Sequence, residues 1–171
     1  MSAAPSLSAR GMAVGQTGFR ARATRLVQRL LNGLQALSPL ADLAIRFYVG
    51  SVFFKSGLTK LMSWDSTLSL FENEYAVPLL PPEMAAVLGT GVELGLPVLL
   101  ALGLGARGAA FGLFVFNIIA VVSYPDLGAV GLKDHQVWGL LLLVPLLHGP
   151  GRLSLDHLIR RHVLKDDAAS R

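Results

Sequence analysis

The sequence contains no cysteine and few charged residues. The absence of cysteine excludes a disulfide, a cysteine nucleophile and an iron–sulfur cluster bound through the chain's own thiolates. Charged residues make up 15% of the chain, against about 25% in an average soluble domain. Hydrophobic residues make up 53%, the mean hydropathy is +0.55, and the apolar residues lie in long runs. This composition predicts an all-α integral membrane protein built as one bundle of 171 residues.

Acidic residues are also absent from the first 38 residues, which form a basic N-terminal extension. The extension contains five arginines: Arg10, Arg20, Arg22, Arg25 and Arg29. Apolar residues recur among them at nearly helical spacing: Phe19, Leu26, Leu30, Leu34 and Leu37. We expect residues 1–18 to be disordered and the remainder to form an amphipathic helix on an anionic lipid surface. A nucleic-acid partner is not expected, because the interleaved aromatic residues of a base-stacking platform are missing.

Four apolar segments predict transmembrane helices, which need about 20 residues each. They cover residues 39–62, 82–104, 106–124 and 133–148. Ser38 and Pro39 are typical of a helix start, and Pro82 repeats that signal. The fourth segment is short, so it must thin the bilayer locally, sit under its neighbours or rely on flanking polar residues. Residues 39–150 therefore predict a four-helix transmembrane domain. The basic tail, residues 151–171, follows with a short cytoplasmic helix near 154–164.

The distribution of positive charge predicts the orientation of the chain. Arginine and lysine gather in the N-terminal extension and in the tail, whereas no basic residue lies between Lys60 and Arg107. Basic loops stay on the cytoplasmic side. Both termini are therefore expected in the cytoplasm, and the loops around 63–81 and 125–132 are expected outside.

One face of the first span carries most of its polar residues. At 100° per residue, Asp42, Arg46 and Lys60 fall near one line, together with Gly50 and Gly57. This face is expected to point into the bundle, with Asp42 able to pair with Arg46 four residues away. Lys55 lies on the opposite side, and its role is not assigned.

An acid in the second span, Glu93, is the natural partner for a base on this face. If the first span begins at Pro39, Arg46 and Glu93 differ in depth by about 6 Å, within reach of an arginine side chain. We therefore predict a buried Arg46–Glu93 pair. Two interpretations remain open: an ion pair that fixes helix register, and a ligand, proton or quinone-headgroup site.

Small and amide residues predict close helix packing. The pairs are Gly91 with Gly95 and Gly108 with Gly112, and Asn117 is expected to bond between helices. No catalytic residue is assigned, and no metal site is expected, because His135 is predicted outside and the other histidines inside. The outer loops offer a surface for a partner, whose candidate residues are Glu72, Glu74, Tyr75, Asp134 and His135.

Several short motifs together resemble the DoxX family of small four-helix bacterial membrane proteins. They are Arg46-Phe-Tyr-Val-Gly50, Ser56-Gly57-Leu-Thr-Lys60-Leu61, the stretch from Glu93 to Arg107, and Gly149-Pro-Gly-Arg-Leu-Ser-Leu-Asp156. The resemblance implies a multi-pass protein of the bacterial inner (plasma) membrane, tied to redox or oxidative-stress systems. Residues 70–82 are similar to a subgroup encoded beside copper-binding peptides. The family offers no agreed catalytic residue.

Two functions remain open from the sequence, beside a third in which the chain is a purely structural bundle that recruits other membrane proteins. The first is a non-catalytic membrane subunit or anchor of a redox or metal-stress system, copper included, with a quinone near Arg46 and Glu93 and a protein partner of redox or metal-handling type. The second is a small transporter or exporter component, built as a homo-oligomer, that uses the intramembrane polar line of Asp42, Arg46, Lys60 and Glu93.

Overall fold

The computed structural model describes the backbone of residues 7–169 and the side chains of Arg22 and residues 24–162. Every regular element in this part of the chain is a helix. The six helices are α1 (Leu7–Met62), α2 (Trp64–Asn73), α3 (Pro82–Leu102), α4 (Ala106–Ser123), α5 (Gly128–His148) and α6 (Leu155–Ala169). The chain divides into two compact units, Met1–Ser38 and Pro39–Arg171.

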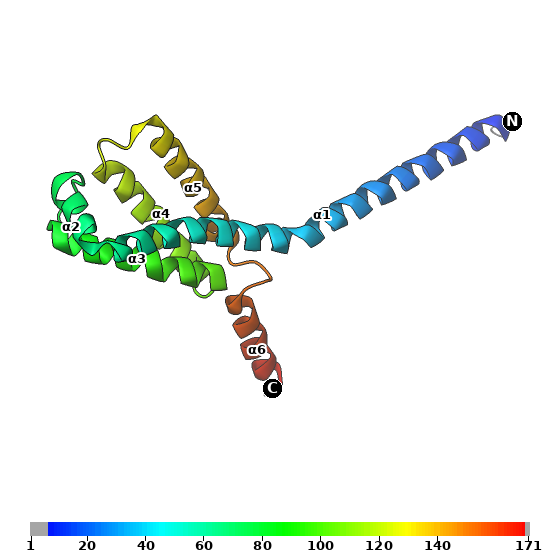
Figure 1. The fold of residues 1–171 in the computed structure, drawn as a ribbon. Coiled ribbons are helices and arrows are strands. Elements are labelled where there is room, and N and C mark those ends of the chain that lie inside the picture. Colours follow the sequence, from blue (N-terminus) through cyan, green and yellow to red (C-terminus); the bar gives the residue numbers. More distant parts are fainter. Residues whose placement is uncertain (1–6, 170–171) are drawn as a thin grey trace. The chain divides into compact units, whose positions relative to one another are not determined.

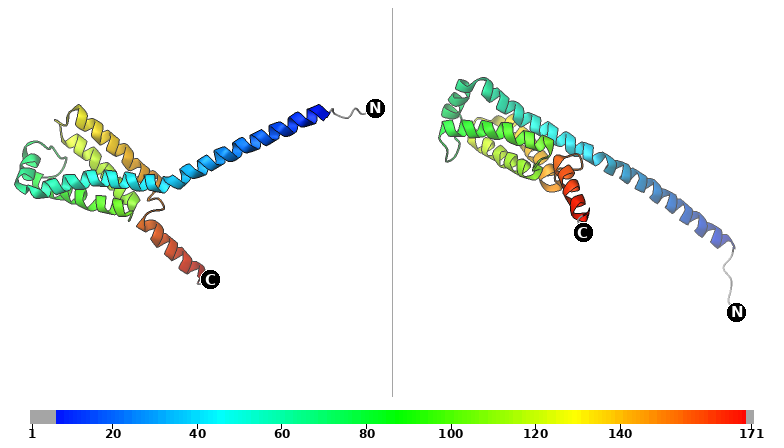
Figure 2. Two further views of the ribbon diagram at one scale, coloured as in Figure 1. Left: turned by 45° about the vertical axis from the view of Figure 1, so that its right-hand side comes forward. Right: turned by 90° about the horizontal axis from the view of Figure 1, so that it is seen from below.

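The four expected spans are confirmed as helices apolar and long enough to cross a membrane. Residues 39–62 of α1 run alongside α3, α4 and α5, while α2 lies at one end of this bundle and α6 leaves from the other (Figure 1, Figure 2). We call these the α2 end and the α6 end. The predicted boundaries of the second and third spans agree with α3 and α4 to within two residues, the usual uncertainty of helix ends.

Helix α1 extends beyond the start predicted for the first span. It begins at Leu7 and continues through Pro39, so the backbone of residues 7–38 is helical as well. Residues 1–6 lie outside the described part of the chain. Proline removes one backbone donor but leaves the other helical bonds in place, so a long helix can continue past it. The exposed leucines of the basic segment, such as Leu26, Leu30 and Leu34, lie on this helix.

The fourth span is longer than predicted. α5 begins at Gly128, five residues before Lys133, and reaches 21 residues. At 1.5 Å per residue this is about 30 Å, which matches the thickness of the hydrocarbon core.

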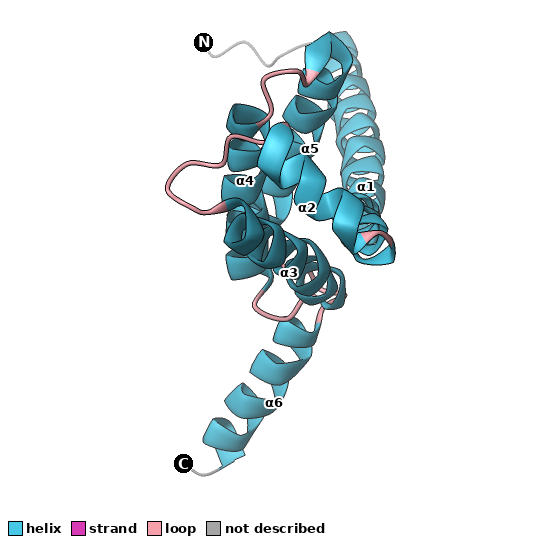
Figure 3. Ribbon diagram, turned by 60° about the vertical axis from the view of Figure 1, so that its left-hand side comes forward, coloured by secondary structure: helices cyan, strands magenta, loops and turns pink. Residues whose placement is uncertain are grey.

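Helix α2 was not predicted and closes one end of the bundle, as Figure 3 shows. It has an apolar face at helical spacing, in which Trp64, Leu68 and Phe71 pack with Ala85 and Ala86 of α3. This i, i+4, i+7 pattern was readable from the sequence. The following loop is tied to α4, because the Ala76 N–H donates to the Ser123 carbonyl at 2.8 Å.

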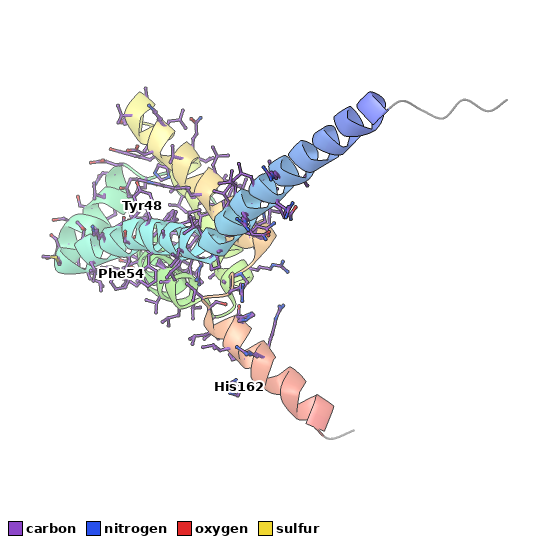
Figure 4. The ribbon with its side chains drawn as sticks, turned by 90° about the vertical axis from the view of Figure 1, so that its right-hand side faces the viewer. Tyr48, Phe54 and His162 are labelled. Atoms are coloured by element: carbon purple, nitrogen blue, oxygen red, sulfur yellow. The ribbon has the colours of Figure 1, made fainter. Side chains whose placement is uncertain are left out.

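The helices α1 and α3 approach closely at two glycines of α1. A Cβ added to Gly50 would lie 3.3 Å from the Pro97 carbonyl oxygen, and one added to Gly57 would lie 3.0 Å from the Glu93 Cβ. The main apolar core is formed where α1 and α3 pack against α4 and α5. Its buried members are Val49, Phe53, Leu100, Ala109, Ala110, Leu113 and Leu142. The outward side of α1 carries apolar residues such as Tyr48 and Phe54, labelled in Figure 4, as expected for a surface facing lipid.

Candidate functional site

The predicted Arg46–Glu93 pair is wrong, because Glu93 pairs with Lys60. The Lys60 ammonium lies 2.7 Å from Glu93 Oε1 and 2.6 Å from Oε2. The side chains are 15% and 6% exposed, respectively. The error came from using Pro39 as the inner end of the first span. Since α1 passes through Pro39, its true register on α3 places Glu93 opposite Gly57, about 17 Å along the helix from Arg46.

Ser56 completes a small polar cluster around Lys60 and Glu93. Its hydroxyl donates to Glu93 Oε1 and accepts from Lys60, both at 3.0 Å. The three ammonium contacts of Lys60 therefore all go to this cluster. Charge neutralisation within one pocket makes these two ions tolerable at membrane depth.

Arg46 lies near the α6 end and is 1% exposed. Its guanidinium donates to the carbonyls of Leu100 at 3.4 Å and Ala101 at 3.5 Å, and to the carbonyl of Leu153. The first two carbonyls belong to the last turn of α3, which has no partner for them within the helix. A cation here also complements the helix dipole. The Nε atom of Arg46 is buried without a hydrogen-bond partner.

Glycine 103 makes room for that guanidinium. It ends α3 in the left-handed conformation at φ +70°, with Gly103 N–H donating to Leu100 and Leu104 N–H to Leu99. This is a Schellman cap. A Cβ at Gly103 would lie 2.3 Å from Arg46 Nη1, so the close contact requires glycine.

Two acidic residues make contacts between the segment that follows α5 and the α6 end of the bundle. The Asp156 carboxylate accepts from Gly105 N–H at 2.9 Å and Ala106 N–H at 3.2 Å, and so caps α4 from another helix. Asp42 lies against Gly151, whose added Cβ would be 3.0 Å from Asp42 Oδ2. The structure records no salt bridge between Asp42 and Arg46 within the described residues. Arg46 therefore belongs to a structural junction of α1, α3 and the residue 149–156 segment.

A cavity of about 510 Å³ lies in the half of the bundle nearer α2. Residues of α1 to α5 line it, and most of its wall is apolar. Phe53 meets Phe116 edge-on at 6.3 Å and Trp138 at 6.0 Å between ring centres. The volume falls in the range of small-molecule sites, about 300–1,000 Å³.

Polar groups enter this cavity at a few points. Lys60, Glu93 and Ser56 form one, and His135 forms another. Ser123 also lines the cavity; it is 3% exposed, and its hydroxyl has no hydrogen-bond partner. A buried hydroxyl without a hydrogen-bond partner costs free energy. Sequence reasoning missed Ser123 because a lone serine at a helix end carries no pattern.

His135 and Asn117 are joined across α4 and α5. Asn117 Nδ2 donates to the His135 carbonyl at 2.9 Å, and Asn117 Oδ1 lies 2.7 Å from His135 Nδ1. The His135 ring also packs against Trp138 with ring centres 4.8 Å apart. The structure thus places His135 in the cavity wall, half-buried, although the sequence suggested an outer surface.

Two tyrosines lie at the α2 end of the cavity. Tyr75 meets Phe71 and Tyr124 edge-on, at 4.9 and 5.0 Å. Burial raises the pKa of Tyr75, with the negative charge of neighbouring groups adding to the effect. The pKa of Tyr124 is raised chiefly by the charge of Glu74. Glu72, Glu74 and Asp134 are exposed at this end.

Of the glycines predicted to allow close helix packing in α3 and α4, one lies against a neighbouring helix and three do not. Gly112 faces Leu96 of α3, at 2.6 Å from an added Cβ to Leu96 Cδ1, whereas Gly91, Gly95 and Gly108 meet nothing within 4 Å. Lys55 is exposed. No group of three or more potential metal ligands gathers within the described residues.

Comparison with known proteins gives the family. The DoxX family model matches residues 41–125. An uncharacterized protein of Haemophilus influenzae is 30% identical over 131 residues, which cover 72% of this chain and 86% of that protein. No solved structure matches this chain.

Proposed function

The chain belongs to the DoxX family of multi-pass membrane proteins, and we propose that it is a membrane subunit of a redox system whose cavity binds a ligand of the quinone class. The observation that carries this proposal is the cavity of about 510 Å³ between α1 and α5, apolar over most of its wall and polar at a few points. Membrane quinones have this character: a flat apolar ring with two oxygen atoms, reached from the lipid phase.

The residues present fit such a group. Phe53, Phe116 and Trp138 offer ring faces and edges for an aromatic headgroup. The His135 ring lies in the cavity wall and offers a hydrogen-bonding nitrogen to the oxygen-bearing groups of the headgroup. A bound quinone would supply two-electron, two-proton carrier chemistry. The chain's own residues bind and orient the ring and keep water from it.

The sequence suggested a quinone near both Arg46 and Glu93, whereas we propose a site near Glu93 alone, because only Glu93 lines the cavity. Arg46 bonds carbonyls at the α6 end and does not line the cavity. Metal stress, copper included, would then act through the ligands of a protein partner. The exposed acids Glu72, Glu74 and Asp134, expected on the outer side, are the proposed contact surface for that partner.

Packing of the bundle supports binding over transport. The transport alternative needs a polar line from Lys60 to Arg46. Along α1 these positions are separated by Val49, 1% exposed, and Phe53, 3% exposed, both within the apolar core. Gly50 between them is closed by Pro97.

Tryptophan fluorescence tests the binding proposal directly. The chain has two tryptophans, so Trp64→Phe leaves Trp138 as the reporter in the cavity wall. Titration of the nanodisc-reconstituted protein with duroquinone should give saturable quenching. Gly89→Leu should fill the cavity and weaken binding by about tenfold or more, since Gly89 faces Phe71 and Phe116.

Gly91→Leu is the matched control, because Gly91 lies on the same helix, is exposed and meets nothing within 4 Å. It should bind like the parent. Quenching that rises linearly and equally in both variants would reject the cavity as the site.

Purification from native membranes in mild detergent then tests the subunit role. Enriched quinone with a stoichiometric redox partner is expected, and a homo-oligomer with neither would favour transport.

A further inference from the structure

The hydrogen bonds of Asn117 fix which nitrogen of His135 carries a proton. A backbone carbonyl can only accept, so the Asn117 atom that faces the His135 carbonyl must be its NH2 group. The other amide atom is then the oxygen, which lies 2.7 Å from His135 Nδ1. An oxygen acceptor there requires Nδ1 to carry hydrogen.

This assignment leaves Nε2 as the remaining hydrogen-bonding atom of the ring. His135 lines the cavity, and its ring is held by Asn117 on one side and Trp138 on another. No carboxylate lies within salt-bridge distance of His135 among the described residues, so no ion pair there stabilises a second proton. The neutral ring therefore presents the lone pair of Nε2 as an acceptor.

The charged cluster also presents acceptors. The ammonium of Lys60 already donates to Glu93 Oε1, Glu93 Oε2 and Ser56, and the Ser56 hydroxyl donates to Glu93. Its three N–H groups are thus used, whereas a carboxylate has about four lone-pair sites, of which three are filled here.

The other polar groups of the cavity wall do not supply enough donors to outweigh the acceptors of His135 and Glu93. The hydroxyls of Tyr75 and Tyr124 can donate or accept. The Trp138 indole N–H is a donor only, but it is neutral and gives weaker hydrogen bonds than the charged cluster.

We propose that the cavity binds the reduced, hydroxyl-bearing form of its quinone-class ligand in preference to the oxidised form. A quinol can donate its hydroxyl hydrogens to His135 Nε2 and Glu93, whereas a quinone has carbonyl oxygens alone and leaves both acceptors unpaired. Asn117 is the positioning residue, since it holds the tautomer. This inference rests on the proposed function, because the quinone class of the ligand is taken from there.

Anaerobic calorimetric titration of the nanodisc-reconstituted protein with durohydroquinone and with duroquinone tests the preference. The dissociation constant for the quinol should be lower by about tenfold. A tenfold ratio would raise the two-electron potential of the bound couple by about 30 mV. Asn117→Leu frees the ring to place its hydrogen on Nε2, and the ratio should fall toward one. His135→Phe, which removes the acceptor, should do the same and serves if Asn117→Leu does not fold.

Thr90→Val is the control, because Thr90 is 3% exposed but does not line the cavity. It should keep the parent ratio. Equal affinities in the parent, or tighter binding of the quinone, would overturn the inference while leaving the ligand class standing. A preference that survives both Asn117→Leu and His135→Phe would overturn the role of these residues. Binding of neither compound would overturn the proposed function as well.

Discussion

Lys60 of α1 and Glu93 of α3 form an ion pair at 2.6 Å, 33 positions apart in the chain, in the wall of an apolar cavity. The pair joins two antiparallel helices at the level where Gly57 lets their backbones approach. It therefore serves both the packing of the bundle and the polarity of the cavity.

Removal of one ion of the pair should destabilise the protein more than removal of both. Lys60→Met leaves a buried Glu93 carboxylate without its cation, and Glu93→Met leaves the ammonium alone. Each should lower the free energy of unfolding by about 3–5 kcal/mol. The double variant leaves no uncompensated charge and should recover most of this loss. Thermal unfolding in a single detergent measures all three; a double variant as unstable as the singles would contradict the argument.

Glycine 103 should be far less replaceable than Gly105. Both have positive φ, +70° and +55°, so alanine strains the backbone at either position by about 1–2 kcal/mol. Only at Gly103 would the new Cβ also meet Arg46 Nη1 and Ser154 Cβ, at 2.3 and 2.5 Å. Gly103→Ala should therefore cost about 1–3 kcal/mol more than Gly105→Ala in thermal unfolding. Equal losses would show that Arg46 does not need this space.

The cap that Asp156 provides for α4 should contribute measurably to stability. Asp156→Ala removes the acceptor for the N–H groups of Gly105 and Ala106, which should cost about 0.5–2 kcal/mol. Asp156→Asn keeps one acceptor oxygen and should lose less. Chemical unfolding monitored by helical circular dichroism can rank the three proteins. If alanine and asparagine both match the parent, the contact does not hold the α3–α4 turn.

Tyrosine ionisation at the α2 end should depend on Glu74. Because the pKa of Tyr124 is raised mainly by that carboxylate, Glu74→Gln should lower it. The protonated phenol is favoured in the folded state, so its contribution to stability is present below the ordinary value of 10.0 and is lost as pH rises through the higher folded value. Absorbance titration near 295 nm, with Tyr124→Phe to assign the signal, measures the shift. No change on Glu74→Gln would place the cause elsewhere.

The sequence identified many of the residues of the site, but it did not show which of them contact each other. Arg46, Lys60, Glu93 and Asn117 stood out because polar groups are rare in apolar runs. The pairing was wrong because it depended on one helix boundary. Ser123 and the role of His135 could not be read, since a cavity wall gathers residues from five elements with no common spacing.

The sequence by itself determined the membrane class and the four spans, because a run of about 20 apolar residues must cross the bilayer as a helix whatever surrounds it. It also determined the start of α3 at Pro82. Only the tertiary structure decided which base meets Glu93. The register of two helices is set by how their side chains and glycines pack against each other, and the periodicity of either helix alone contains no such information.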